Sequence, residues 1–250
     1  MIPYLFNTFF YQPLYNGLVL LVSLIPYGDV GIAIIILTVI VKVVILPVTH
    51  RSVKSQAKLK NIEPYVKKIK EEHHNNRELQ AKKIMELYKE HGVSPFSGCL
   101  LVLLQMPVIL ALYWVFVKGL DQPDSNLLYS FVHPPEVISM MFFGVVDLTQ
   151  KNIILALCAG VSQYFQMRLT LPPTPKEESG SQKENAGKAS FQNELAKSMN
   201  MQMRYFLPVF ITIVAYSISA AVALYLVVSS LFSIGHELFV RRKSEGLIKN

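Results

Sequence analysis

The chain has 250 residues, a hydrophobic fraction of 52% and a charged fraction of only 16%. This composition excludes an ordinary soluble domain and predicts an integral membrane protein. The formal net charge is +7, and both cysteines, Cys99 and Cys158, fall inside apolar stretches, so we expect reduced, packed thiols rather than a disulfide.

The N-terminal segment, residues 1–28, is apolar but is interrupted by Asn7, Gln12, Pro13 and Asn16. It therefore lacks a clean membrane-spanning run, and it also lacks the basic n-region of a signal peptide. We expect an extracytoplasmic helix that lies in the membrane interface, with its tyrosines at the level of the lipid headgroups.

Five apolar stretches follow that are long enough, or nearly so, to cross a hydrocarbon core of about 30 Å, which takes roughly 20 helical residues. The last two run together, and we divide them near Ser217-Ile218-Ser219, where small polar residues allow a tight turn. The predicted fold class is an all-α polytopic membrane protein with a five-helix transmembrane core. The spans are residues 29–49, 97–118, 152–171 and, for the fourth and fifth helices together, 204–240.

Lysine and arginine are concentrated in residues 50–96, in residues 172–203 and in the tail at residues 241–250. Five spans place all three regions on one side of the membrane, and short basic loops stay in the cytoplasm. We therefore expect the N-terminus outside the cell and the C-terminus in the cytoplasm. Residues 119–151 then form an extracytoplasmic loop. Residues 172–203 are rich in Pro, Ser, Gly, Glu and Lys, and we expect them to form a flexible cytoplasmic loop.

Residues 50–96 have the pattern of a cytoplasmic helical hairpin. Apolar residues recur at spacings of three and four from Leu59 to Ile69 and continue on a second arm at Ile84 and Leu87. The polar turn His73-His74-Asn75-Asn76 lies between the arms and indicates an antiparallel pair with basic outer faces. A solvated charged hairpin without a partner is the alternative. The paired histidines lack companion ligands at suitable spacing, so we predict neither a metal site nor a cofactor.

Lys42 lies well inside the first span. A lysine at a helix centre costs about 2.5 to 3.5 kcal/mol, whereas the aliphatic residues around it supply about 4 to 8 kcal/mol, so the span still inserts. Thr38 lies one turn away on the same face, which favours a hydrated cavity that faces the bundle. The alternative is a lysine on a lipid-facing helix whose side chain reaches toward the membrane surface.

Several blocks of the chain are similar to one known family. They are LPVTHRSVKSQAKLKNIEPYVKKIKEE, GVSPFSGCLLVLLQMPVILALY and ALYLVVSSLFSIGHEL, and they follow in order along the chain. The second block is the most specific, because its Gly-Cys and Gln-Met-Pro elements have little reason to recur by chance at that spacing. The chain thus resembles the YidC/Oxa/Alb family of membrane protein insertases. Because few residues precede the first span, we expect a bacterial member without the large periplasmic domain.

The resemblance implies a multi-pass protein of the bacterial inner membrane that integrates membrane proteins and helps them fold, and that is not an enzyme. It also implies a positively charged hydrophilic groove open to cytoplasm and lipid, with an apolar slide along the second and fourth spans. Lys42 stands where the family usually has an arginine. The groove residues are Lys42, Thr38, Thr212, Gln105 and Tyr225, and the slide residues are Ile109 and Val214.

The partners implied by the resemblance are nascent membrane proteins and the ribosome. The Sec translocon, the signal recognition particle pathway and anionic lipids are further candidates, and the protein itself is expected to be a monomer. The expected ribosome or lipid contacts are the hairpin lysines Lys67, Lys68 and Lys70 and the tail residues Arg241, Arg242 and Lys243. The alternative function is a small transporter or channel that uses Lys42 to bind an anionic solute.

Overall fold

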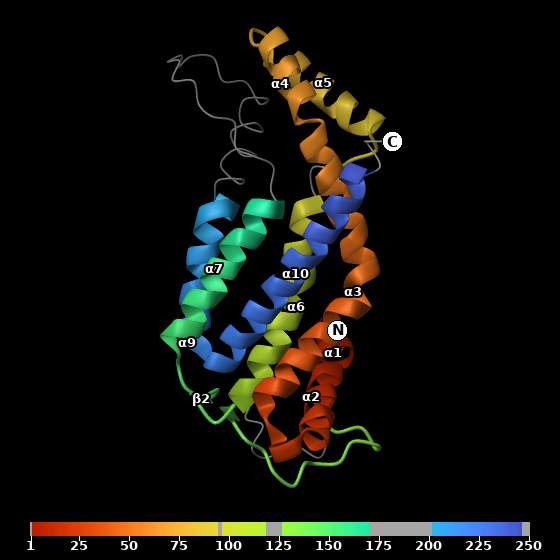
Figure 1. Cartoon of the computed structure of the whole chain (residues 1–250). Coiled ribbons are helices and arrows are strands. Elements are labelled where there is room, and N and C mark those ends of the chain that lie inside the picture. The colour runs from red at the N-terminus through yellow and green to blue at the C-terminus, as the bar shows by residue number, and fades with distance from the viewer. Residues whose placement is uncertain (1, 95–96, 119–126, 171–201, 247–250) are drawn as a thin grey trace.

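A computed structural model describes residues 2–94, 97–118, 127–170 and 202–246 (Figure 1). The elements are almost entirely helical, so the predicted all-α class is confirmed. The N-terminal elements are α1 (Ile2–Phe6), the π-helical turn η1 (Asn7–Tyr11), α2 (Gln12–Leu24) and the short turn η2 (Pro26–Gly28). The long helices of the bundle are α3 (Val30–Asn61), α6 (Ser97–Lys118), α7 (Ile153–Thr170), α9 (Leu207–Ile218) and α10 (Ala220–Gly246).

The remaining elements lie at the two ends of this bundle. The helices α4 (Glu63–Glu72) and α5 (Arg77–Glu90) project from one end (Figure 1). The strands β1 (Met141–Phe142) and β2 (Val146–Asp147) form a two-stranded antiparallel ribbon near the other end. A π-helical turn, η3 (Gln202–Phe206), leads into α9.

Two helices in the described part of the chain are long and apolar enough to cross a membrane, Val30–Asn61 and Ala220–Val240. Two shorter apolar helices are Leu103–Phe116 and Arg204–Ile218. The helices α6 and α7 have 22 and 18 residues, lengths of about 33 and 27 Å at 1.5 Å per residue. Each of the five predicted spans thus contains a helix, and the number of crossings stays a prediction.

Asp29 begins α3 by capping it. Its Oδ1 accepts hydrogen bonds from the amides of Gly31 at 2.8 Å and Ile32 at 3.1 Å, which satisfies two of the four amides that a helix start leaves unpaired. Its Oδ2 accepts from the amide of Phe143 at 2.9 Å, which fastens the helix to the strand ribbon. The helix then continues through Pro47 to Asn61, so one helix joins the first predicted span to the start of the hairpin region.

The N-terminal helices pack against the bundle. Leu18 and Val19 are fully buried, and Asn16 donates to the carbonyl of Leu127 at 2.8 Å. Tyr11 and Tyr15 are buried within the protein and stack on each other with ring centroids 5.9 Å apart, and the interfacial position of this segment stays a prediction. This placement follows from their spacing of four, which puts both rings on the helix face that meets α3 and α6.

The helix α10 packs against both α7 and α3, and its first turn is buried. The helical structure is interrupted between α9 and α10 at Ser219, whose backbone is extended. The first free amides of α10 are satisfied from outside the helix, because Ala220 donates to the carbonyl of Gln150 at 2.8 Å and Ala221 to that of Leu148 at 3.1 Å. Small alanines at this point allow the close approach of the strand ribbon.

The hairpin arms α4 and α5 contact each other along a narrow apolar seam that includes buried Ile84. Asn76 caps α5 by accepting from the amide of Leu79 at 3.0 Å. Gln80 ties the arms together by donating to the carbonyl of Lys70 at 3.0 Å. The charged side chains therefore point outward and leave a strongly basic outer surface.

Candidate functional site at Lys42

Lys42 lies at the centre of a polar cluster formed by three helices. Its side chain is only 9% exposed, although it carries an ammonium group. The Nζ donates to Oε1 of Gln105 on α6 at 3.2 Å and to Oγ of Ser233 on α10 at 3.1 Å. Because α3, α6 and α10 each contribute one side chain, the cluster depends on the packing of the bundle. The side chain points into the protein rather than toward lipid.

The partners of Lys42 are themselves held by further hydrogen bonds. The amide nitrogen of Gln105 donates to the hydroxyl of Tyr225, so both ends of the Gln105 side chain are used. The hydroxyl of Ser233 donates to the carbonyl of Ser229 at 2.9 Å while its oxygen accepts from Lys42. These bonds orient two neutral acceptors toward the cation. We call Lys42, Gln105, Tyr225 and Ser233 the polar cluster.

The ammonium of Lys42 has more donors than the described residues use. A lysine ammonium carries three N–H groups, and the residues of the polar cluster accept from two of them. The hydrogen-bonding partners are neutral dipoles, so the positive charge of Lys42 is solvated but not neutralised by them. A buried cation of this kind attracts an oxygen ligand, which is water or an anionic group.

Thr38 lies one helical turn from Lys42 on α3 and is 2% exposed. Its hydroxyl donates to the carbonyl of Ile34 on its own helix at 2.6 Å. Thr38 and Tyr225 both line a small void of about 10 Å³ whose other walls are apolar. This space has about the size of a single water molecule. Thr38 precedes Lys42 on α3, so it lies on the side of Lys42 that is away from the hairpin.

Thr212 has different neighbours. Its hydroxyl donates to the carbonyl of Pro208 at 2.9 Å on its own helix, α9. Its side chain also occupies the place where a Cβ on Gly160 of α7 would lie. Thr212 therefore lies at the interface between α7 and α9. Lys42, Gln105 and Tyr225, in contrast, are joined to one another by hydrogen bonds, and Thr38 lies next to them.

The predicted slide residues lie on α6 and α9. Ile109 and Val214 are each partly buried, and Ile109 packs against the core. The strongly exposed apolar side chains of the same helices recur at spacings of three and four and form one stripe on each helix. They are Leu103, Met106, Leu110 and Trp114 on α6, and Val209, Phe210, Ile213 and Tyr216 on α9.

Sequence reasoning missed several polar contacts of α10. Ser233 was not assigned to the site, and neither was Ser230, which donates to Gln163 on α7 at 3.0 Å. Glu237 is 3% exposed and accepts from Thr170 on α7 at 2.7 Å. The available signal was the spacing of these three residues, since positions 230, 233 and 237 form a polar stripe on an otherwise apolar helix.

A pair of histidines also escaped the sequence reading. Nδ1 of His50 on α3 and Nε2 of His236 on α10 lie 3.2 Å apart. The two residues are 186 positions apart in the sequence, so only the packing of α3 on α10 brings them together. His50 follows Lys42 by two turns, which places the pair between the polar cluster and the hairpin.

The basic residues predicted to meet a ribosome or lipid are on the surface where they are described. Lys67, Lys68 and Lys70 are exposed on α4, and Arg242 is exposed near the end of α10. The side chains of Arg241 and Lys243 lie outside the described part of the structure. On α5 the pKa of the Glu86 carboxyl is lowered, chiefly by a hydrogen bond from Lys83 and also by the surrounding lysine charges. This shift reflects the local contact between Lys83 and Glu86.

Comparison with known proteins identifies relatives over most of the chain. The family described as 60Kd inner membrane protein matches residues 22–246. The membrane protein insertase YidC of Ectopseudomonas mendocina (strain ymp) is 28% identical over 250 residues, which cover 99% of this chain and 36% of that protein. The membrane protein insertase YidC of Francisella tularensis subsp. novicida (strain U112) is 29% identical over 217 residues, 86% of this chain and 33% of that protein.

The chain spans about a third of the length of these relatives. The matched region nevertheless includes all the described bundle helices and the hairpin between them. The family predicted from the sequence blocks is therefore confirmed. The chain belongs to the 60Kd inner membrane protein family, the family of the YidC insertases.

Proposed function

We propose that this protein is an insertase that integrates membrane proteins and helps them fold, with Lys42 as its charged recognition site. The main support for this proposal is that Lys42 is buried and that both of its hydrogen-bond acceptors are neutral side chains. The helices around it have apolar outer faces. The names of the YidC relatives support the same function. Insertion makes and breaks no covalent bond, so the proposed function requires no catalysis.

In the proposed mechanism the unneutralised charge of Lys42 lowers the cost of moving a polar client segment into the membrane. A hydrophilic groove, open to cytoplasm and lipid, admits the segment and the water around it. Lys42 lies about 18 Å along α3 from Val30, which is at the outer end of the helix in the proposed topology. A segment that reaches Lys42 from the cytoplasm therefore has only about 18 Å of a core of about 30 Å left to cross. An acidic group there gains Coulomb attraction and a hydrogen bond from the third ammonium donor.

The apolar part of the client then leaves the groove along α6 and α9. The exposed stripes on these helices, with Ile109 and Val214 beside them, offer the client helix an apolar surface that is continuous with lipid. Burial of the client's own apolar residues drives this step, at about 25 cal/mol for each Å² removed from water. The proposal therefore needs no nucleotide.

The proposed topology has five spans, with the N-terminus outside and the hairpin and tail in the cytoplasm. The distribution of lysine and arginine supports it, because the exposed hairpin lysines lie at the end of the bundle opposite the strand ribbon (Figure 1). Nascent chains reach the groove from the hairpin side in this arrangement. The ribosome, whose RNA is a dense polyanion, is the proposed partner of the basic hairpin.

The test is insertion of client proteins into liposomes that contain the purified protein. Two clients are compared that differ only in whether the flank to be translocated is acidic or neutral. Lys42→Arg should preserve insertion of both clients, because the charge is kept. Lys42→Leu should reduce insertion of the acidic client most. Lys151→Leu removes an exposed lysine far from the polar cluster and serves as the matched control.

Two results would contradict the proposal. Equal insertion of the acidic client by the parent and Lys42→Leu, at equal protein levels, would remove the electrostatic role of Lys42. Saturable flux of a small anion through the same liposomes, abolished by Lys42→Leu and without client insertion, would favour the transporter alternative.

A further inference from the structure

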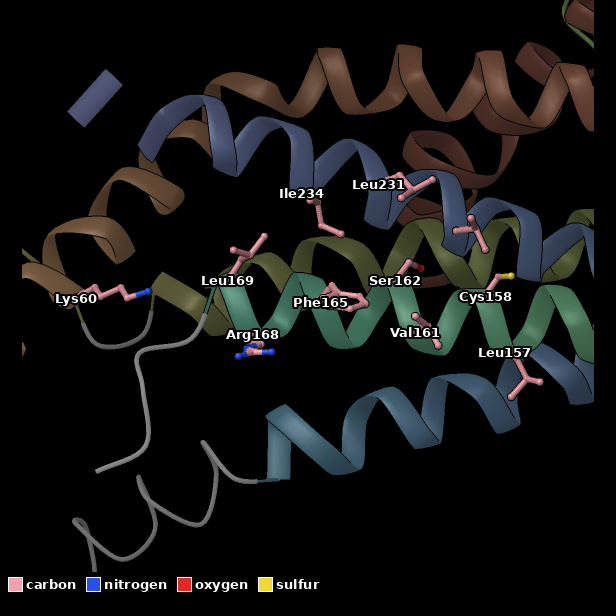
Figure 2. A pocket seen from close by; sticks show the side chains of 11 residues that line it. Lys60, Leu157, Cys158, Val161, Ser162, Phe165, Arg168, Leu169, Leu231 and Ile234 are labelled. Atoms are coloured by element: carbon pink, nitrogen blue, oxygen red, sulfur yellow. The ribbon is translucent and has the colours of Figure 1, made fainter. Parts of the chain in front are cut away.

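An elongated cleft of about 840 Å³ lies between α7 and α10 (Figure 2). Most of its lining is aliphatic or aromatic, and α3 contributes one residue at an end of the cleft. The lining residues are Lys60, Leu157, Cys158, Val161, Ser162, Phe165, Arg168, Leu169, Val227, Leu231 and Ile234.

The cleft is separate from the polar cluster. Successive residues of an α-helix are rotated by about 100°, which places Val227, Leu231 and Ile234 on roughly the opposite side of α10 from Tyr225 and Ser233. The proposed groove and the cleft therefore lie on two different faces of α10. The groove and the cleft can therefore bind different ligands.

The two cations of the cleft lie at the same end. Arg168 is in the last turn of α7 and is exposed, and Lys60 is in the last turn of α3. Figure 2 shows both at the end nearest the hairpin helices, with the ammonium of Lys60 directed toward the end of α7, whereas Leu157 lies at the far end. The lining between this charged end and Leu157 is apolar apart from Ser162. The cleft thus has a charged end and an apolar length.

These dimensions match one leaflet of a bilayer. Leu157 and Arg168 are separated by about 16 Å along the axis of α7, and half of a hydrocarbon core of about 30 Å is about 15 Å. A helix is at least about 10 Å wide with its side chains, so 16 Å of helix fills roughly 1,300 Å³, more than the cleft contains. A group that is seated fully in the cleft is therefore narrower than a protein helix, as a single acyl chain is.

We propose that this cleft binds an anionic phospholipid of the leaflet nearest the hairpin. The acyl chain lies along Phe165 and Leu231, and the phosphate lies between Lys60 and Arg168. A guanidinium holds two phosphate oxygens at once, while the ammonium adds a second positive charge. Each basic residue near an anionic membrane surface strengthens binding about fivefold, so two of them discriminate strongly against zwitterionic lipids.

The test is native mass spectrometry of the purified full-length protein, titrated with phosphatidylglycerol or with phosphatidylcholine of the same acyl chains. The parent should bind phosphatidylglycerol at least tenfold more tightly. Arg168→Gln and Lys60→Gln should each reduce this preference about fivefold, and the double variant should abolish it. Lys58 is an exposed lysine in the last turn of α3 that does not line the cleft. Lys58→Gln should therefore leave the preference for phosphatidylglycerol unchanged.

The apolar part of the site has its own test. Val161→Trp fills the cleft and should weaken binding of both lipids, because the acyl chain is displaced. Three outcomes would overturn the proposal: equal binding of the two lipids by the parent, competition by soluble glycerol phosphate as strong as by the lipid, or a photocrosslinker at position 231 that captures a protein instead of lipid.

Discussion

The substitution Gln105→Glu tests whether Lys42 acts by charge or only by the shape of its surroundings. Glutamate has nearly the size of glutamine and still accepts a hydrogen bond from Lys42, so the packing of α6 against α3 is kept. Its carboxylate also accepts from the hydroxyl of Tyr225, which then becomes the donor of that bond. The change therefore places a negative charge next to Lys42 while leaving the lysine itself intact.

The expected effect follows from the distances in the polar cluster. A client carboxylate about 6 Å from the ammonium gains about 3 kcal/mol at an effective dielectric constant of about 20. The oxygen of residue 105 lies 3.2 Å from Nζ, so a carboxylate there largely cancels the field that the client meets. Loss of this attraction weakens capture of an acidic flank by at most about 100-fold, since each 1.4 kcal/mol is tenfold.

The assay is insertion of the paired acidic and neutral clients into liposomes, with the amount of folded protein measured in parallel. Gln163→Glu is the matched control, because Gln163 also accepts from a serine of α10 but lies on α7. Gln105→Glu should lower insertion of the acidic client and spare the neutral one, and Gln163→Glu should leave their ratio near the parental value. Equal ratios for Gln105→Glu and the parent would refute the electrostatic reasoning, as would an equal loss in both variants.

Three further predictions concern topology, partners and stability. Single cysteines at Val145 and Asn75, in a background with both native cysteines replaced by serine, should be labelled from opposite sides of the membrane; labelling from one side contradicts the orientation. Replacing the hairpin lysines by glutamine should weaken salt-sensitive binding of ribosomes in sedimentation, whereas unchanged binding excludes this partner. Asp29→Ala should destabilise the protein by about 1 to 2 kcal/mol, measured as a lower Tm, because α3 loses its cap. Asp29→Asn, which keeps one acceptor oxygen, should cost less.

The helices were largely predictable from the sequence, because apolar runs and three-to-four spacing report helical structure directly. The extent of α3 was not. The predicted first span ends at residue 49, whereas the helix that contains it continues to Asn61. A proline removes one backbone hydrogen bond, and its neighbouring turns can keep the rest. The buried positions of Tyr11 and Tyr15 were likewise hidden, since amphipathic tyrosines suit both an interface and a core.

The site was predictable only in part, because a sequence does not state which helix faces meet. Lys42 was evident as a cation in an apolar run, and Gln105 and Tyr225 followed from the family resemblance. Ser233 lies 191 positions from Lys42 in the sequence, and no local sequence pattern predicts that the two side chains are in contact. Thr212 illustrates the converse case. Its type suits a polar groove, but its neighbours in the fold are Pro208 and Gly160.

The contacts of Lys42 also bear on why a lysine suits the position at which the family resemblance leads one to expect arginine. A guanidinium has five donors, and the two neutral acceptors of the polar cluster leave three of them for water or for a client. A lysine leaves only one. In the proposed mechanism this lysine therefore offers a client charge and a single hydrogen bond, without the two-pronged geometry that distinguishes one carboxylate arrangement from another. We infer that the number of acidic residues in a client's flank, rather than their exact spacing, sets how well this protein inserts it.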